Sequence, residues 1–133
     1  MRIDGSCHCG SITYEADIDA GKVAICHCTD CQSLSGTAFV AYVSVARADF
    51  RLRGAPTVYV KTSQSGNRRA QAFCPTCGSR IYASAADDPQ VFNLRIGTVR
   101  QRAELRPRQQ VGCRSALRWV MELGSVKQIS TQA

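Results

Sequence analysis

The chain has 133 residues, a hydrophobic content of 44% and a formal net charge of +7. This length favours a single domain with a modest core, and no apolar run is long enough to span a bilayer. Eight cysteines are many for this length, and a secreted protein would use them for disulfides. Because the N-terminal residues lack the apolar region of a signal peptide, we expect a cytoplasmic protein whose cysteines bind metal.

Short β-prone segments separated by turns predict a compact, mostly-β domain with little helix. In chain order, strands are expected over residues 12–16, 22–25, 39–45, 51–53, 57–61, 69–73, 79–83, 91–96 and 109–113. One helical turn is expected over 30–34, where Gly36 would end it. A second short helical turn is expected over 46–50.

The C-terminal segment combines a short apolar stretch with a polar tail. Residues 119–121, Trp-Val-Met, are expected to form a final apolar anchor. The composition after that point favours a frayed tail. We therefore predict one zinc-binding domain over 1–125 and a tail over 126–133.

The densest group of cysteines is Cys26, Cys28 and Cys31. Two cysteines separated by two residues form the usual zinc knuckle, because the turn between them directs both sulfur atoms to one point. Cys26 adds a third sulfur from the end of the preceding predicted strand. Three protein ligands with an open fourth position are typical of a catalytic zinc, whereas a structural zinc has four.

The other cysteines with metal-ligand spacing would close a second zinc site: Cys7, Cys9, Cys74 and Cys77. That site would join the N-terminal segment to a distant hairpin, and its energy would belong to folding. Spacing alone leaves mixed sets open, and also a purely structural role for both sites. Seven thiolates and two zinc ions would change the formal charge from +7 to about +4. The remaining basic residues are scattered, which favours a solvated face over a nucleic-acid surface.

Three further side chains have alternative interpretations. Cys113 lies outside both sets, and is either a small buried hydrophobe or a reactive thiol. His8 and His27 each lie between two cysteines, where an extended backbone points the middle side chain away from the metal. His27 is therefore a candidate proton carrier at the open site rather than a ligand, with a solvated histidine as the alternative.

Four segments, spread over nearly the whole chain, match the pattern of a known family: Cys7-His8-Cys9-Gly10, Cys26-His27-Cys28-Thr29-Asp30-Cys31 with Gly36, Cys74-Pro75-Thr76-Cys77-Gly78, and the late Trp119. In order and spacing they resemble the glutathione-dependent formaldehyde-activating enzyme family, which also includes centromere protein V. The resemblance implies coiled antiparallel sheets, as in methionine sulfoxide reductase B. It also implies a structural zinc on the four cysteines of the second set and an open zinc on Cys26, Cys28 and Cys31.

The activity that the resemblance implies is condensation of formaldehyde with glutathione to S-hydroxymethylglutathione, formally a carbon–sulfur lyase reaction. A substrate thiol would take the fourth position on the open zinc as a thiolate, so Cys26, Cys28 and Cys31 are the expected catalytic centre. His27 or a zinc-bound water would then move the proton. No organic cofactor and no membrane partner are expected.

The residues that would hold glutathione are not evident in the sequence. Arg69 and Arg80 flank the second knuckle and are candidates for pairing with its carboxylates. A second functional hypothesis is a non-catalytic two-zinc module that binds protein or nucleic acid. A third, a sulfoxide reductase using Cys113, is disfavoured because that family's nucleophile lies in an Arg-x-Cys-x-Asn context.

Overall fold

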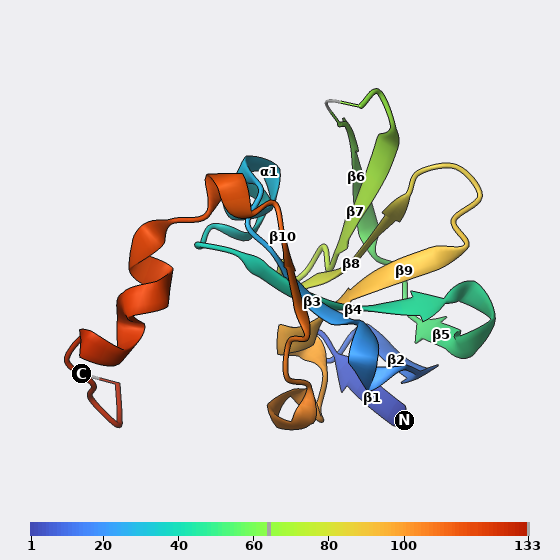
Figure 1. The fold of residues 1–133 in the computed structure, drawn as a ribbon. Coiled ribbons are helices and arrows are strands. Elements are labelled where there is room, and N and C mark those ends of the chain that lie inside the picture. The colour runs from blue at the N-terminus through green and yellow to red at the C-terminus, as the bar shows by residue number, and fades with distance from the viewer. Residues whose placement is uncertain (64, 133) are drawn as a thin grey trace.

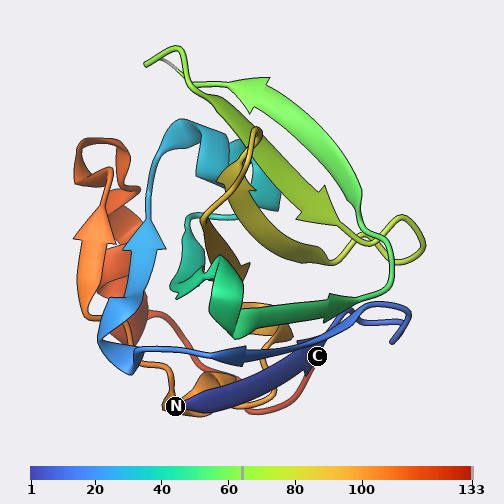
Figure 2. The same cartoon turned by 90° about the vertical axis from the view of Figure 1, so that its right-hand side faces the viewer.

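The computed structural model describes residues 1–63 and 65–132, and its strands form two sheets (Figures 1 and 2). The small sheet has the order β1-β2-β5, with the bounds Arg2–Ser6, Thr13–Asp17 and Phe50–Arg53. The large sheet has the order β10-β3-β4-β9-β8-β7-β6. Its strands are β3 (Val23–Cys26), β4 (Val40–Ala46), β6 (Thr57–Thr62), β7 (Arg68–Phe73), β8 (Arg80–Ala85), β9 (Val91–Arg95) and β10 (Gln109–Val111).

Helical structure in the described chain is limited to α1, Thr29–Ser35, and short 3-10 segments. The 3-10 segments are Ala20–Lys22, Arg47–Asp49, Ile96–Thr98, Arg102–Glu104, Cys113–Ser115 and Arg118–Ser125. Gly36 ends α1 in the left-handed region at φ 71°, where glycine carries no Cβ penalty. The predicted helical turn and its stop are therefore confirmed. None of these helices has the length and apolar character needed to cross a membrane.

The core lies between the two sheets. Side chains alternate along β2, so that Tyr14 and Ala16 are buried while Glu15 is exposed, as expected for a strand with one solvated face. Aromatic rings pack between the two sheets. The ring centroid of Phe50 lies 5.8 Å from that of Tyr14, which is also in the small sheet, and 6.0 Å from that of Tyr82 in the large sheet. Both contacts are edge-to-face, which is a favoured geometry for aromatic pairs.

The expected mostly-β domain is confirmed, and two strands differ in detail from the sequence-based expectation. β1 was not predicted, although Ile3 in it is fully buried. The late strand is shorter than 109–113 and pairs parallel to β3, with Val111 opposite Cys26. The other strand pairs are antiparallel. The parallel pair brings the C-terminal third of the chain beside the densest cysteine group.

The prediction of an apolar anchor over 119–121 is wrong. These residues belong to the 3-10 segment Arg118–Ser125, none of which is buried, and this segment extends away from the sheets in Figure 1. Trp119 is 53% exposed and Met121 is 71% exposed. Apolar residues become an anchor only where a complementary surface covers them. The division into a domain over 1–125 and a tail over 126–133 stays a prediction, and Ala133 lies outside the described residues.

Two residues of β9 differ in burial, so substitutions at them should differ in their effect on stability. Leu94 is fully buried whereas Val91 is 50% exposed. We expect Leu94→Ala to lower the free energy of unfolding by about 2–5 kcal/mol, because it removes buried methyl groups and leaves a cavity. Val91→Ala, the control, should change it by less than about 0.5 kcal/mol. Equal effects in urea-induced unfolding would contradict this placement of the core.

Candidate metal centre

Four sulfur atoms meet where the two sheets approach each other. Cys7 and Cys9 lie in the turn after β1, and Cys74 and Cys77 in the turn between β7 and β8, with all four sulfurs within 4.8 Å of one another. The Sγ–Sγ distance is 3.6 Å from Cys7 to Cys9 and 3.7 Å from Cys9 to Cys74. All eight cysteines are free thiols. Sulfurs at 2.3 Å from a tetrahedral zinc would be about 3.8 Å apart, so the spacing fits a closed four-sulfur metal site.

Hydrogen bonds hold these sulfurs in place. The backbone N–H of Ile12 donates to Cys7 Sγ at 3.3 Å, and the N–H of Cys77 donates to Cys74 Sγ at 3.5 Å. The Ser11 hydroxyl lies 3.1 Å from Cys9 Sγ and 3.3 Å from Cys74 Sγ. Hydrogen bonds of this kind hold metal-binding sulfur atoms in a fixed orientation, and Ser11 was not among the predicted site residues. Its only signal in the sequence is its place two residues after Cys9.

The same contacts favour ionised sulfur. Hydrogen bonds from the hydroxyl and the backbone N–H of Ser79 lower the pKa of Cys77 to about 5. Burial opposes ionisation of Cys7, but hydrogen bonds from Ile12 and Ser11 outweigh it and lower its pKa to about 7. Because a thiolate is the form that binds metal, the surroundings of this group suit a cation.

The second group consists of Cys26 at the end of β3, Cys28 at the N-cap of α1 and Cys31 in its first turn. Their sulfurs also lie within 4.8 Å of one another, and the N–H of Cys31 donates to Cys28 Sγ at 3.3 Å. No further histidine, cysteine or carboxylate of the described residues joins this group. The structure therefore brings the seven cysteines together in the two sets that the spacing indicated, four and three, and both sets could hold a metal ion.

The three thiols do not ionise alike. Burial, and then the neighbouring Cys28 and Cys26, raise the pKa of Cys31. For Cys28, burial is outweighed by the N–H and thiol of Cys31 and by Cys26, with a smaller effect of the Lys61 charge, so its pKa is lowered. Three adjacent thiolates repel one another unless a cation lies between them. This donor set, soft and negatively charged when ionised, fits a thiophilic divalent metal.

A cleft of about 390 Å³ opens onto Cys31. Its apolar lining includes Leu34 of α1 together with Phe39 and Val40. The cleft also has a polar side, made by Asp30, Lys61, Gln71, Ser79, Arg80 and Arg95. Of the two arginines that the sequence offered for glutathione, Arg80 lines the cleft, whereas Arg69 is not among its lining residues in the described chain. Lys61, Gln71 and Arg95 have no signal in the sequence, since they come from separate strands.

His27 directly follows β3, and its side chain is not among those that line the cleft at Cys31. Its side chain is 1% exposed, so the alternative of a solvated histidine is wrong. Its Nε2 donates to Gln110 Oε1 of β10 at 2.7 Å, while the buried Nδ1 has no partner in the described chain. His27 lines a separate hollow of about 500 Å³, together with Phe39 and Gln110, and not the cleft at Cys31. Its proton-carrying role stays a prediction.

The turn after β10 approaches the three-cysteine group closely. Gly112 has φ 65°, and a Cβ on it would lie 3.0 Å from the backbone nitrogen of Cys28. Gln32 Nε2 donates to the carbonyl oxygens of His27 at 2.8 Å and of Ser115 at 2.9 Å, which ties α1 to this turn. Cys113 is exposed here, so its interpretation as a buried hydrophobe is wrong.

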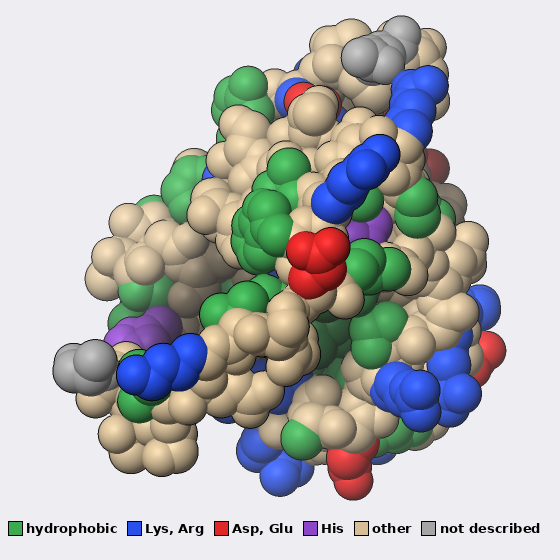
Figure 3. All heavy atoms as spheres, turned by 60° about the vertical axis from the view of Figure 1, so that its left-hand side comes forward, with side chains coloured by type: hydrophobic (Ala, Val, Ile, Leu, Met, Phe, Trp, Pro, Cys, Tyr) green, Lys and Arg blue, Asp and Glu red, His purple; other side chains and the backbone are tan. Residues whose placement is uncertain are grey.

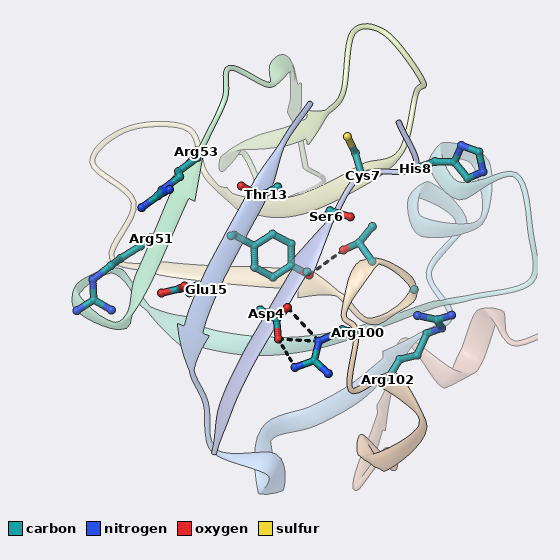
Figure 4. A pocket seen from close by; sticks show the side chains of 14 residues that line it. Asp4, Ser6, Cys7, His8, Thr13, Glu15, Arg51, Arg53, Arg100 and Arg102 are labelled. Atoms are coloured by element: carbon teal, nitrogen blue, oxygen red, sulfur yellow. Dashed lines mark hydrogen bonds and ion pairs between the residues drawn. The ribbon is translucent and has the colours of Figure 1, made fainter. Parts of the chain in front are cut away.

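A larger hollow, of about 570 Å³, lies over the small sheet (Figure 4). Arg51 and Arg53 of β5 extend along one side of it, and Arg102 lies on the other. Arg100 is already neutralised there, because its guanidinium pairs with Asp4 at 2.8 Å. This hollow contains one member of the four-sulfur group, Cys7, and none of the three-sulfur group. The cleft at Cys31 is therefore the better candidate for chemistry.

Serine variants should separate the two cysteine groups. Cys74→Ser should unfold the domain or leave it much less stable, because a closed metal site that joins the two sheets contributes folding free energy directly. Cys31→Ser should keep the fold and lose one metal ion per chain. Circular dichroism and elemental analysis measure both effects, with Cys113→Ser as a control that should change neither. If Cys31→Ser is as unstable as Cys74→Ser, the three-cysteine group is structural.

Comparison with known proteins agrees with this arrangement of cysteines. The family model described as glutathione-dependent formaldehyde-activating enzyme matches residues 2–115. Among solved structures, a crystal structure of a protein from Rhodobacter sphaeroides superposes with a TM-score of 0.61 at 18% sequence identity, covering 81% of this chain and 99% of that chain. At this identity the likeness concerns the fold. The search of curated proteins finds no match. Since the family model spans most of the chain and contains both cysteine groups, this protein belongs to the glutathione-dependent formaldehyde-activating enzyme family.

Proposed function

We propose that the protein is a zinc-dependent enzyme of the carbon–sulfur lyase type, which joins a thiol such as glutathione to a small aldehyde such as formaldehyde. The observation that carries the proposal is that the three-cysteine group adjoins a cleft, which Cys31 lines. Family membership supports glutathione and formaldehyde as the substrates. The four-cysteine group would hold a second, structural zinc.

The charge of the donor set favours thiol chemistry over hydrolysis. Cys26, Cys28 and Cys31 would hold a zinc ion in a site of net charge about −1, which would lower its Lewis acidity and would suit a soft sulfur ligand in its thiolate form. In the reaction, the substrate sulfur forms a bond to the carbonyl carbon. The carbonyl oxygen gains the proton that the thiol lost, so atoms and charge balance.

Residues of the cleft would orient the substrate and balance this negative charge. Arg95 is partly buried, and burial lowers its pKa while the nearby charges of Cys31 and Cys26 act in the opposite direction. The apolar side chains of Leu34 and Phe39 line the cleft and would keep water from the aldehyde. A low local dielectric strengthens the attraction between the cations of the cleft and an anionic sulfur.

The charge distribution supports the enzyme over a nucleic-acid-binding module. On the face shown in Figure 3, basic side chains lie in separate places with apolar and acidic side chains between them. Several arginines are also paired with carboxylates, as Arg2 is with Glu15 and Arg68 with Asp87. A continuous basic surface is the usual footprint of a nucleic-acid site. The proposed cytoplasmic location stays a prediction.

Cobalt substitution tests the thiol ligation. We expect glutathione to change the thiolate-to-metal charge-transfer absorption of the cobalt-loaded protein in a saturable way, because a fourth sulfur would join the three of the protein. In Cys31→Ser the change should be absent, and Cys113→Ser should respond like the wild type. A response is then followed by measuring formaldehyde–glutathione condensation against the uncatalysed rate in the same buffer.

Absence of any spectral change with glutathione or other small thiols would remove the ground for this mechanism. The three-cysteine group would then be better explained by a structural or binding role. A spectral response without acceleration of the condensation would keep thiol binding and reject formaldehyde–glutathione condensation as the reaction.

His27 is the proposed proton carrier, and its neighbour Gln110 offers a matched control. If His27 moves the proton, His27→Gln should lower kcat on the order of a hundredfold. Gln110→Met, which removes the hydrogen bond to Nε2 but keeps the imidazole, should lower it far less. Thermal unfolding of both variants shows whether the fold is disturbed. Equal losses of kcat in the two variants would assign His27 a positioning role instead.

A further inference from the structure

Arg80 carries a charge that no side chain of the described chain neutralises. It begins β8, three residues after Cys77, and lines the cleft that opens onto Cys31. None of the ion pairs found among the described residues involves it. Its Nη1 is buried without a hydrogen-bond partner. A buried donor without an acceptor is unfavourable, so this nitrogen points to a ligand that the cleft is built to receive.

The guanidinium is held rather than free to swing into solvent. Its Cζ lies 5.4 Å from the centroid of the Phe73 ring, at the end of the neighbouring strand β7. A guanidinium over an aromatic face gains electrostatic attraction and keeps its planar edge available for hydrogen bonds. The Phe73 contact therefore fixes where Arg80 can present its donors.

The other two cations of the cleft already have partners. Lys61 pairs with Asp30, and the lysine side chain is only 18% exposed. Arg95 Nη2 donates to Gln71 Oε1 at 3.2 Å, and Gln71 is buried. These contacts hold Lys61 and Arg95 in position, and both add positive potential to the cleft. Arg80 is the cation of the described cleft that still lacks an acceptor.

We propose that Arg80 is a specificity-determining residue that binds a carboxylate of the thiol substrate while the substrate sulfur lies at the three-cysteine group. The proposal rests on the proposed function, and it names the substrate class as thiols that carry a carboxylate. Arginine and carboxylate form paired, parallel hydrogen bonds, and a cleft with two further cations favours an anionic group over its neutral ester. Neutral thiols of the same size then bind weakly.

The test compares acid and ester forms of one thiol. Isothermal titration calorimetry of the zinc-loaded protein would use glutathione and its diethyl ester as probes. We expect the acid to bind more tightly than the ester. Arg80→Gln should weaken acid binding roughly tenfold to a hundredfold, the value of a hydrogen bond to a charged group, and leave ester binding unchanged. Arg80→Lys should bind the acid more tightly than Arg80→Gln but less tightly than the wild type, because lysine keeps the positive charge and lacks the paired N–H donors of the guanidinium.

Controls separate recognition from packing. Arg69→Gln, on the adjacent strand β7, changes an arginine that is not among the cleft-lining residues and should leave both affinities at wild-type values. Circular dichroism and metal content verify that each variant is folded and loaded. Equal affinity of the wild type for acid and ester would overturn the proposal. Equal weakening of both probes by Arg80→Gln would overturn it too, because a packing defect does not distinguish them.

S-methylglutathione distinguishes failure of this proposal from failure of the proposed function, since it keeps both carboxylates but has no free thiol. If no thiol changes the cobalt spectrum, and S-methylglutathione nevertheless binds the wild type more tightly than Arg80→Gln, the carboxylate site stands and the thiol mechanism fails. If S-methylglutathione binds both proteins alike while thiols do ligate the metal, the mechanism stands and the role of Arg80 is rejected.

Discussion

Four sulfur atoms from two distant parts of the chain determine how the two sheets meet. Cys7 and Cys9 follow the first strand of the small sheet, and Cys74 and Cys77 form the turn between two strands of the large sheet. A metal at this point would cross-link segments more than sixty residues apart, and the energy of such a cross-link is folding energy. Without it, the sheets rely on a modest core of aliphatic side chains and one cluster of aromatic rings.

The four-cysteine group also adjoins the cleft. Ser79, which hydrogen-bonds Cys77, and Arg80 follow the cysteine turn directly, and both line the cleft. Cys31 also lines the cleft, and it lies in the helix α1 that Cys28 caps with its sulfur. The four-cysteine group and the three-cysteine group are thus connected through a few residues that line the cleft.

Several buried polar groups in this region are held by partners from other strands. Arg95 lies against Gln71, and His27 lies against Gln110. Polar groups buried in this way stabilise the fold only when their hydrogen bonds are made, so each partner restricts the conformations that the site can adopt. The exceptions, Arg80 Nη1 and His27 Nδ1, are informative for this reason. The first lies in the cleft and is explained by an anionic ligand, whereas the second lies in a separate hollow.

The sequence by itself predicted the mostly-β class, the helical turn that ends at Gly36 and the grouping of seven cysteines, because these depend on local spacing. Two cysteines three positions apart converge whatever surrounds them, and a glycine that ends a helix does so by its own backbone freedom. The order and spacing of the cysteine motifs also carried the family resemblance.

Only the tertiary structure decided the features that depend on contacts between distant residues. The exposure of Trp119 and Cys113, the burial of His27 against Gln110 and the parallel strand β10 all belong to this class. The cations of the cleft do as well, since Lys61, Arg80 and Arg95 lie on three different strands. Periodicity records which face of a strand is apolar, but burial and charge pairing are set by the neighbouring strands, which only the folded chain brings together.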